Sequence, residues 1–335
     1  MPCTHLFAND KPTMQRLHTL LTTLIIVVLS TMIVTSCSDT KDDDWGNTSE
    51  AKNANSNDTS TEPALARLEF PNVKTLYGKP MTSNTMLRIY SNNDQYGINY
   101  SVLWDIDKKA QRWSAYQMFK GMKSSAGLSS SFTEDPTLPF SYRVKDSHNF
   151  YSGSGFDRGH ICPNADRQYS KEANQQTYYY TNMQPQYHMF NAGPRLPSGE
   201  QDWSRKSPWL RLEEKVRAWA KATDVDTLYV VKGGTIEDDQ LLKSQPRIKG
   251  EMPVPGYFFV ALLVKNRQAQ PYRAIGFLIP HDNADHADDP LSNYAINIRQ
   301  LEEETGFDFF CNLPDDVENH IETLPIENIL KVWKP

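Results

Sequence analysis

Apolar positions along the chain group into runs that have the length of β-strands. Four runs fit this pattern, and they cover residues 98–104, 228–231, 257–264 and 274–279. The run 257–264 is apolar almost throughout, which indicates a central strand covered on both faces. The first half of the chain therefore contributes one clear strand and the second half contributes three.

Apolar residues recur at helical spacing after Ser207. Ser207 is a suitable N-cap and Pro208 suits the first helical position. The side chains expected to face the core are Trp209, Leu212, Val216 and Trp219. The pattern predicts a long amphipathic helix that begins at residue 208.

Two further segments are predicted to be helical. Ser170 can cap a helix that runs through residues 178–180, and residues 293–305 form another helical pattern that ends at Gly306. Strands and helices are mixed without regular βαβ alternation. We therefore expect an α+β domain.

The N-terminus has the pattern of an export signal. Lys11 and Arg16 precede an apolar run over residues 20–34, which is too short for a typical membrane-spanning helix of about 20 residues. The run ends at the sequence Val-Thr-Ser-Cys, which resembles the cleavage site of bacterial lipoproteins. We predict a lipoprotein-type signal peptide over residues 1–36 and lipidation of Cys37, with an uncleaved signal anchor or ordinary cleavage as the alternatives.

Residues 37–64 are almost entirely polar and rich in acids. Such a segment cannot bury enough apolar surface to offset its chain entropy, so we predict a disordered tether. The folded domain is then expected over residues 65–335. The protein would be exported as an outer-membrane or cell-surface lipoprotein anchored to the membrane through Cys37, or else be periplasmic or secreted.

Composition supports a globular domain but does not indicate a ligand. Of the 335 residues, 39% are hydrophobic and 11% aromatic, which is enough for a sizeable core. The formal net charge of −6 gives no indication of nucleic-acid binding. A local basic groove remains compatible with that total, because the field at a cleft matters more than net charge.

Residues 156–191, together with Glu213 and Arg217, offer the groups that phosphodiester hydrolysis requires. That reaction needs a base for the attacking water, and a neutral histidine such as His160 suits this role at neutral pH. It also needs a hard cation held by oxygen ligands, for which Asn191 and Glu213 are candidates. Arg158 and Arg217 can neutralise phosphate oxygens.

These residues belong to a series of motifs that resembles a known family. The series contains Asp157-Arg158-Gly159-His160, then Pro-Asn-Ala-Asp at 163–166, Thr-Asn-Met-Gln-Pro-Gln at 181–186, Phe190-Asn191 and Trp-Leu-Arg-Leu-Glu at 209–213. In this order they resemble the DNA/RNA non-specific endonucleases of the ββα-metal class, from about residue 95 to residues 308–315. The resemblance implies a ββα-metal fold with a central, mainly antiparallel sheet flanked by helices.

The resemblance also implies roles for individual residues. His160 matches the general base and Asn191 the direct ligand of Mg²⁺, which Mn²⁺ can replace. Glu213 matches the acid that holds the metal through its waters. Arg158 and Arg217 match phosphate contacts. Glu213 and Arg217 are four residues apart, so on a helix they share a face and can approach each other.

Two other positions match the family less directly. Asp157 matches a support residue for the motif and the metal hydration shell. Asn182 matches a further polar position, either a substrate contact or a structural residue. The chain departs from the family pattern in a longer spacer over residues 192–208, and it has no arginine over residues 129–136.

Cys162 and Cys311 are the cysteines expected in the mature domain besides Cys37. Export permits a disulfide between them, which we predict. Their spacing lacks the short pairs that are typical of zinc sites.

The sequence therefore predicts a Mg²⁺-dependent endonuclease that hydrolyses DNA and RNA. Two alternatives stay open. One is a catalytically weak surface protein that binds nucleic acid, and the other is a phosphodiesterase of another substrate class on the same fold. The sequence leaves the oligomeric state open.

Overall fold

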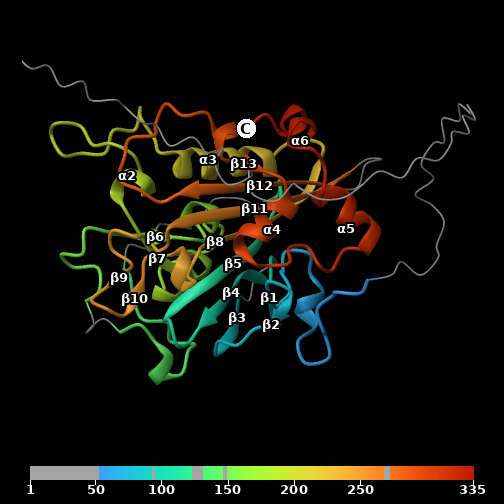
Figure 1. Cartoon of the computed structure of the whole chain (residues 1–335), viewed down its shortest axis with the longest axis horizontal. Helices are drawn as coiled ribbons and strands as arrows, with labels where there is room; N and C mark the ends of the chain where they lie inside the picture. Colours follow the sequence, from blue (N-terminus) through green and yellow to red (C-terminus); the bar gives the residue numbers. More distant parts are fainter. Residues whose placement is uncertain (1–52, 93–94, 123–130, 146–148, 268–271) are drawn as a thin grey trace, which may run out of the picture. The chain divides into compact units, whose positions relative to one another are not determined.

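An antiparallel sheet organises the chain (Figure 1). The computed structural model describes residues 53–92, 95–122, 131–145, 149–267 and 272–335. Seven strands pair in the order β13-β12-β11-β8-β5-β4-β3, each antiparallel to its neighbours. They are β3 (Thr85–Ser91), β4 (Ile98–Asp105), β5 (Ala110–Met118), β8 (Val225–Gly234), β11 (Tyr257–Asn266), β12 (Tyr272–Pro280) and β13 (Ala295–Ile296). The predicted α+β fold with a central antiparallel sheet is confirmed.

The four strands predicted from apolar runs are β4, β8, β11 and β12. β11 lies inside the sheet between β8 and β12, as its continuous apolar run indicates. Its side chains alternate between two hydrophobic cores, one on each face, with Phe258, Val260 and Leu262 opposite Phe259, Ala261 and Leu263. The sheet therefore separates two cores.

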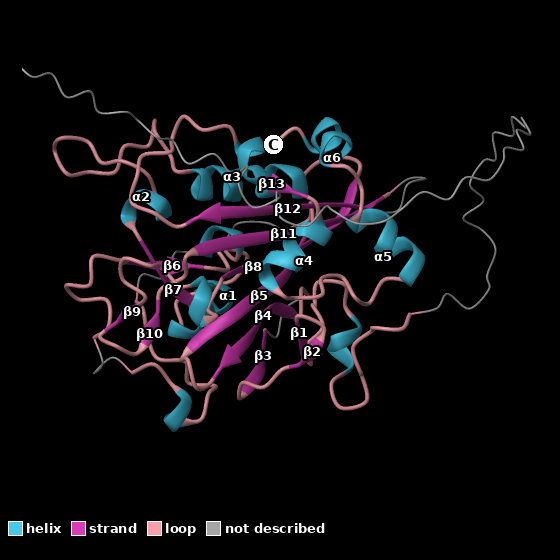
Figure 2. Ribbon diagram, viewed as in Figure 1, coloured by secondary structure: helices cyan, strands magenta, loops and turns pink. Residues whose placement is uncertain are grey.

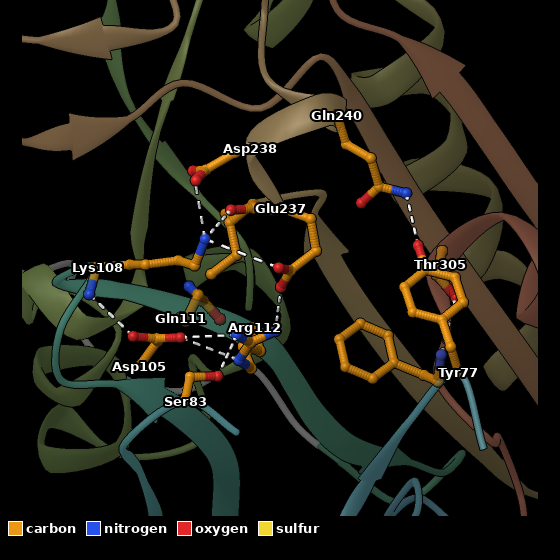
Figure 3. Close-up of polar contacts among 12 residues, drawn as sticks. Tyr77, Ser83, Asp105, Lys108, Gln111, Arg112, Glu237, Asp238, Gln240 and Thr305 are labelled. Carbon is orange, nitrogen blue, oxygen red and sulfur yellow. Dashed lines mark hydrogen bonds and ion pairs between the residues drawn. The ribbon is translucent and has the colours of Figure 1, made fainter. Parts of the chain in front are cut away.

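β5 was not predicted, because its sequence includes a buried arginine. The Arg112 side chain is 2% exposed and bonds Asp105 Oδ2 at 2.8 and 3.1 Å, Glu237 Oε1 at 2.7 Å and Ser83 Oγ at 2.6 Å (Figure 3). A buried charge is tolerated when it is paired in this way. The network ties the β4–β5 hairpin to the residue that precedes the 3₁₀-helix η6 (Asp238–Gln240).

Helices pack on both faces of the sheet (Figure 2). The predicted long helix is α3 (Pro208–Ala220), and Ser207 caps it by accepting a hydrogen bond from the Leu210 N–H. α3 and α6 (Ile326–Trp333) contribute to one core, whereas α4 (Ile298–Thr305) and α5 (Asp315–Glu322) contribute to the other. Two short hairpins, β1 (Thr75–Leu76) with β2 (Lys79–Pro80) and β9 (Arg247–Ile248) with β10 (Met252–Pro253), lie outside the main sheet.

Two predicted helices are shorter than expected. Ser170 caps α1 as predicted, but α1 (Lys171–Gln176) ends before the tyrosines, and a 3₁₀-helix follows at Tyr180–Asn182. The segment 293–305 divides into η7 (Leu291–Tyr294), β13 and α4. The division occurs because the Asn297 side chain caps α4 by accepting from the Gln300 N–H, so that helix starts late; Gly306, at φ 77°, ends it as predicted.

The ordered chain begins earlier than the predicted boundary at residue 65. Asn53 Nδ2 donates to the carbonyl oxygens of Cys311 and Leu313, and Asn57 Nδ2 donates to the Pro71 carbonyl. Residues 53–64 therefore belong to the domain and not to a tether. The predicted signal peptide, Cys37 and the rest of the tether lie outside the described residues. Of the helices that the structure describes, none is long and apolar enough to span a membrane.

The predicted disulfide is wrong. Cys162 and Cys311 are both buried free thiols. Cys162 belongs to the core that contains α3, whereas the Cys311 sulfur lies 3.7 Å from the carbonyl oxygen of Phe70, a residue of the opposite core. The sheet stands between the two cysteines.

Candidate active site

Two short strands and a short helix bring the ends of the 156–191 segment together. β6 (Asp157–His160) pairs antiparallel with β7 (Met183–Gln186), and α2 (His188–Asn191) follows β7. Gly159 allows this close pairing, because a Cβ atom there would lie 2.2 Å from the side-chain carboxamide carbon of Gln186. This ββα unit packs its apolar residues into the same core as α3.

Four of the predicted site residues line one open cleft with a volume of about 640 Å³. They are Asp157, Arg158, His160 and Asn191, and the other lining residues are Phe132, Asn149, Tyr151, Ser152 and Phe156. The structure thus brings together a proposed support residue, phosphate contact, base and metal ligand, of which the first and last, Asp157 and Asn191, are 34 positions apart in sequence.

Asp157 sets the orientation of the Asn191 amide. Asn191 Nδ2 donates to Asp157 Oδ2 at 3.1 Å. Because a carboxylate only accepts hydrogen bonds, the amide nitrogen must face Asp157, and the amide oxygen Oδ1 faces the other way. Asp157 thus fixes the orientation of Asn191, whereas its support of the motif and of a metal hydration shell stays a prediction.

Arg158 is held by aromatic rings. Its guanidinium carbon lies 5.1 Å from the ring centroid of Phe132 and 5.4 Å from that of Tyr151. These distances are in the range of cation–π contacts. Among the described residues Arg158 forms no ion pair, so its charge stays available for an anionic group in the cleft.

His160 is half-buried between aromatic side chains. The edge of Tyr178 lies against its ring at a centroid distance of 4.9 Å, and Phe132 lies at 5.6 Å. Burial, aided by the positive charge of Lys232, lowers the pKa of His160 to about 4. The imidazole is therefore neutral at neutral pH, and its buried Nε2 has no hydrogen-bond partner in the described part of the chain.

Glu213 and Arg217 do not line this cleft. Glu213 Oε1 pairs with Lys232 Nζ at 2.7 Å, and Arg217 pairs with Asp166 Oδ1 at 3.0 Å. Glu213 faces a small enclosed cavity shared with Tyr116, and burial raises its pKa. The two residues share a helix, as predicted, but each is paired with a partner from another segment and not with the other.

Asn182 is a structural residue and not a substrate contact. It is fully buried, its Oδ1 accepts from the Cys162 N–H, and its Nδ2 donates to the carbonyl oxygens of Cys162 and Thr177. These hydrogen bonds fix the backbone of Cys162, two residues after His160. No polar atom of Asn182 is left to meet a ligand in the cleft.

The residues of the cleft fit a hydrated hard cation. Asn191 Oδ1 makes no hydrogen bond to a described residue, and the Asp157 carboxylate lies beside the same amide. Oxygen ligands of this kind, completed by water, are what Mg²⁺ prefers. Nowhere in the described ranges do three or more His, Cys, Asp or Glu side chains form a metal-binding group.

Four residues at or near the site had no role assigned from the sequence. Asp166 pairs with Arg217, and Lys232 pairs with Glu213. In the sequence, Lys232 is recognisable only as a single cation that follows the apolar run of a predicted strand. His188 contacts Asp157, and His281 accepts a hydrogen bond from the backbone N–H of the residue that precedes α2. Their contacts cross between distant segments, so sequence spacing gives no signal for them.

Comparison with known proteins identifies relatives of most of the folded region. The DNA/RNA non-specific endonuclease family matches residues 79–316. A nuclease of Nostoc sp. is 29% identical over 67% of this chain and 75% of its own length. The mitochondrial nuclease EXOG of Xenopus laevis is 27% identical over a region that covers 72% of this chain and 62% of the relative's own length. A chain of the crystallised EndoG/EndoGI complex is similar in fold, with a TM-score of 0.52, 19% identity, and coverage of 71% of this chain and 89% of that chain.

Proposed function

Because the chain belongs to the DNA/RNA non-specific endonuclease family, we propose that it hydrolyses phosphodiester bonds of both DNA and RNA in a Mg²⁺-dependent reaction. The observation that carries this proposal is the shared cleft, in which His160, Arg158 and the Asn191 amide converge. Contacts that fall on phosphate and not on base edges account for cleavage without sequence specificity.

His160 acts as the general base in this proposal. Its neutral imidazole accepts a proton from a water molecule, and the oxygen of that water attacks phosphorus. The phosphorus–oxygen bond to the leaving nucleotide then breaks, and the leaving oxygen takes up a proton from water. Arg158 neutralises charge that develops on the phosphate oxygens, and its aromatic neighbours hold it in place for that contact. Asn191 would hold the metal through Oδ1. When bound, Mg²⁺ supplies stabilisation of negative charge on the phosphate and on the leaving oxygen.

Two ion pairs, Glu213–Lys232 and Asp166–Arg217, lie outside the lining of this cleft. Glu213 is proposed to contact the metal only through water, and Arg217 to contact phosphate after release from Asp166. Both roles require the observed pairs to open when substrate and metal bind.

The substrate class is tested with polymers and a small diester in parallel. The purified protein is incubated with supercoiled plasmid, single-stranded DNA, RNA and bis(p-nitrophenyl) phosphate, with Mg²⁺, with EDTA, and with Mg²⁺ restored. We expect internal cleavage of all three polymers, loss of cleavage in EDTA and its recovery with Mg²⁺. Hydrolysis of the small diester alone would indicate a different phosphodiesterase. Binding of DNA without any cleavage would indicate a surface nucleic-acid-binding protein.

We further propose that the protein is exported and anchored through lipid on Cys37. The support is the charged and apolar N-terminal pattern that ends at this cysteine. Metabolic labelling with a palmitate analogue tests it. Label on the wild type and none on Cys37→Ser is expected, and equal labelling of both contradicts the proposal.

A further inference from the structure

His188 links the proposed metal ligand to the loop that follows it. His188 begins α2, the short helix that ends at Asn191. Its Nδ1 lies 2.7 Å from Asp157 Oδ2, and this same oxygen accepts the Asn191 amide at 3.1 Å. Since the carboxylate only accepts, the proton in the His188–Asp157 bond belongs to the imidazole. Asp157 Oδ2 thus accepts two hydrogen bonds, one from the His188 ring and one from the Asn191 side-chain amide.

The other side of the His188 ring faces the loop over residues 192–207. Its Nε2 lies 3.0 Å from Gln201 Oε1, and Gln201 Nε2 donates to the Pro194 carbonyl at 3.1 Å. The ring is therefore fixed from the loop, and its orientation does not depend on Asp157 alone.

We propose that His188 is a positioning residue that holds the Asp157 carboxylate in the place where it orients the Asn191 amide toward a bound metal. The inference rests on the proposed function, because it assumes that Asn191 Oδ1 is a metal ligand. The Asp157 side chain is 34% exposed, so without His188 it has room to turn toward solvent. The Asn191 amide would then lose its fixed orientation and offer nitrogen as readily as oxygen.

Loss of such a supporting partner typically weakens metal binding about 10–100-fold. The test measures Mn²⁺ affinity of the purified protein by electron paramagnetic resonance, which does not depend on turnover. We expect His188→Ala to weaken Mn²⁺ binding at least about tenfold.

Two conservative variants separate positioning from a purely structural role. The amide nitrogen of asparagine can occupy the place of Nδ1, whereas that of glutamine occupies the place of Nε2. His188→Asn is expected to restore Mn²⁺ affinity to within about threefold of wild type, and His188→Gln is expected to stay as weak as His188→Ala. If His188→Ala fails to fold, the Asn and Gln pair still decides the question.

His286 supplies a matched control. Its ring nitrogens also contact acceptor oxygens, with Nδ1 2.9 Å from Asp289 and Nε2 3.0 Å from Asp282, but it does not line the cleft. His286→Ala should bind Mn²⁺ as the wild type does. Equal Mn²⁺ affinity of wild type and His188→Ala would overturn the inference while leaving metal-dependent cleavage intact. Absence of metal-dependent cleavage by the wild type would instead overturn the proposed function and the inference with it.

Discussion

The cleft residues are held by contacts of different physical kinds. Aromatic rings hold Arg158, a carboxylate holds the Asn191 amide, and the rings of Tyr178 and Phe132 pack against His160. None of these contacts neutralises the cation or protonates the imidazole. The site is therefore organised around groups that stay reactive at neutral pH.

The pH dependence of activity follows from the environment of His160. Because burial and Lys232 lower the pKa of His160 to about 4, the neutral, active form persists well below the ordinary histidine value of about 6.5. Activity should therefore be lost only as the pH falls through about 4. The measurement is kcat/KM against pH at saturating Mg²⁺, with circular dichroism at each pH to confirm folding. An acidic limb centred near about 6.5 would contradict the assignment.

At the scale of elements, α2 depends on its neighbours. A helix of four residues has little stability of its own. Its N-cap residue Tyr187 has no side-chain cap, but the Tyr187 N–H donates to His281 Nε2 at 2.8 Å, and His281 Nδ1 is 2.7 Å from the Pro255 carbonyl oxygen. His281 thus fixes the start of the helix that carries Asn191.

Replacing His281 with phenylalanine should keep the aromatic packing and remove both hydrogen bonds. The Tyr187 N–H and the Pro255 carbonyl would be left unpaired in a site where His281 is 2% exposed. The expected cost is about 1–3 kcal/mol in the free energy of unfolding. Urea denaturation measures it, with the exposed His320→Ala as control. A His281→Phe variant as stable as wild type would show that this bond does not hold α2.

Sequence spacing predicted where helices and strands lie, but it did not predict which residues from different elements contact each other. Ser207, Pro208 and the apolar spacing define α3 almost to the residue, because local capping and one buried stripe decide that helix. The same spacing placed Glu213 and Arg217 on α3 but gave no indication of Lys232 and Asp166, which are distant in sequence. β5 was missed because the buried charge of Arg112 is compensated by partners that only the fold assembles.

At the scale of the molecule, the start of the described chain is bound to the C-terminal region. Asn55 Nδ2 donates to Asp308 and to Glu318. Burial, aided by the negative charges of Asp308 and Glu302, raises the pKa of Glu318. Composition predicted a tether here because the segment has few apolar residues. Its asparagines order it through side-chain hydrogen bonds, which a count of apolar residues does not register.

The buried acids make stability depend on pH. Burial raises the pKa of Glu318 to about 8. The folded state therefore binds a proton that the unfolded chain releases above about 4.5, so this contribution to stability is complete below pH 4.5 and is lost as the pH rises toward 8. Glu318→Gln, which resembles the protonated acid, should match wild type at low pH and exceed its Tm by roughly 3 °C or more near pH 8.

Thermal unfolding of both proteins across this pH range measures the effect. The exposed Glu303→Gln is the control, and it should follow the wild type at every pH. A Tm difference between Glu318→Gln and wild type that does not grow with pH would contradict the buried, protonated state of Glu318.

The central claim is that His160 activates water in a cleft whose metal is held by Asn191. The most direct measurement is the rate of Mg²⁺-dependent plasmid cleavage by wild type, His160→Ala and the control His320→Ala, each shown to be folded. We expect His160→Ala to cleave about 10²–10⁴-fold more slowly and His320→Ala to match wild type. A folded His160→Ala variant that degrades plasmid at the wild-type rate would contradict it.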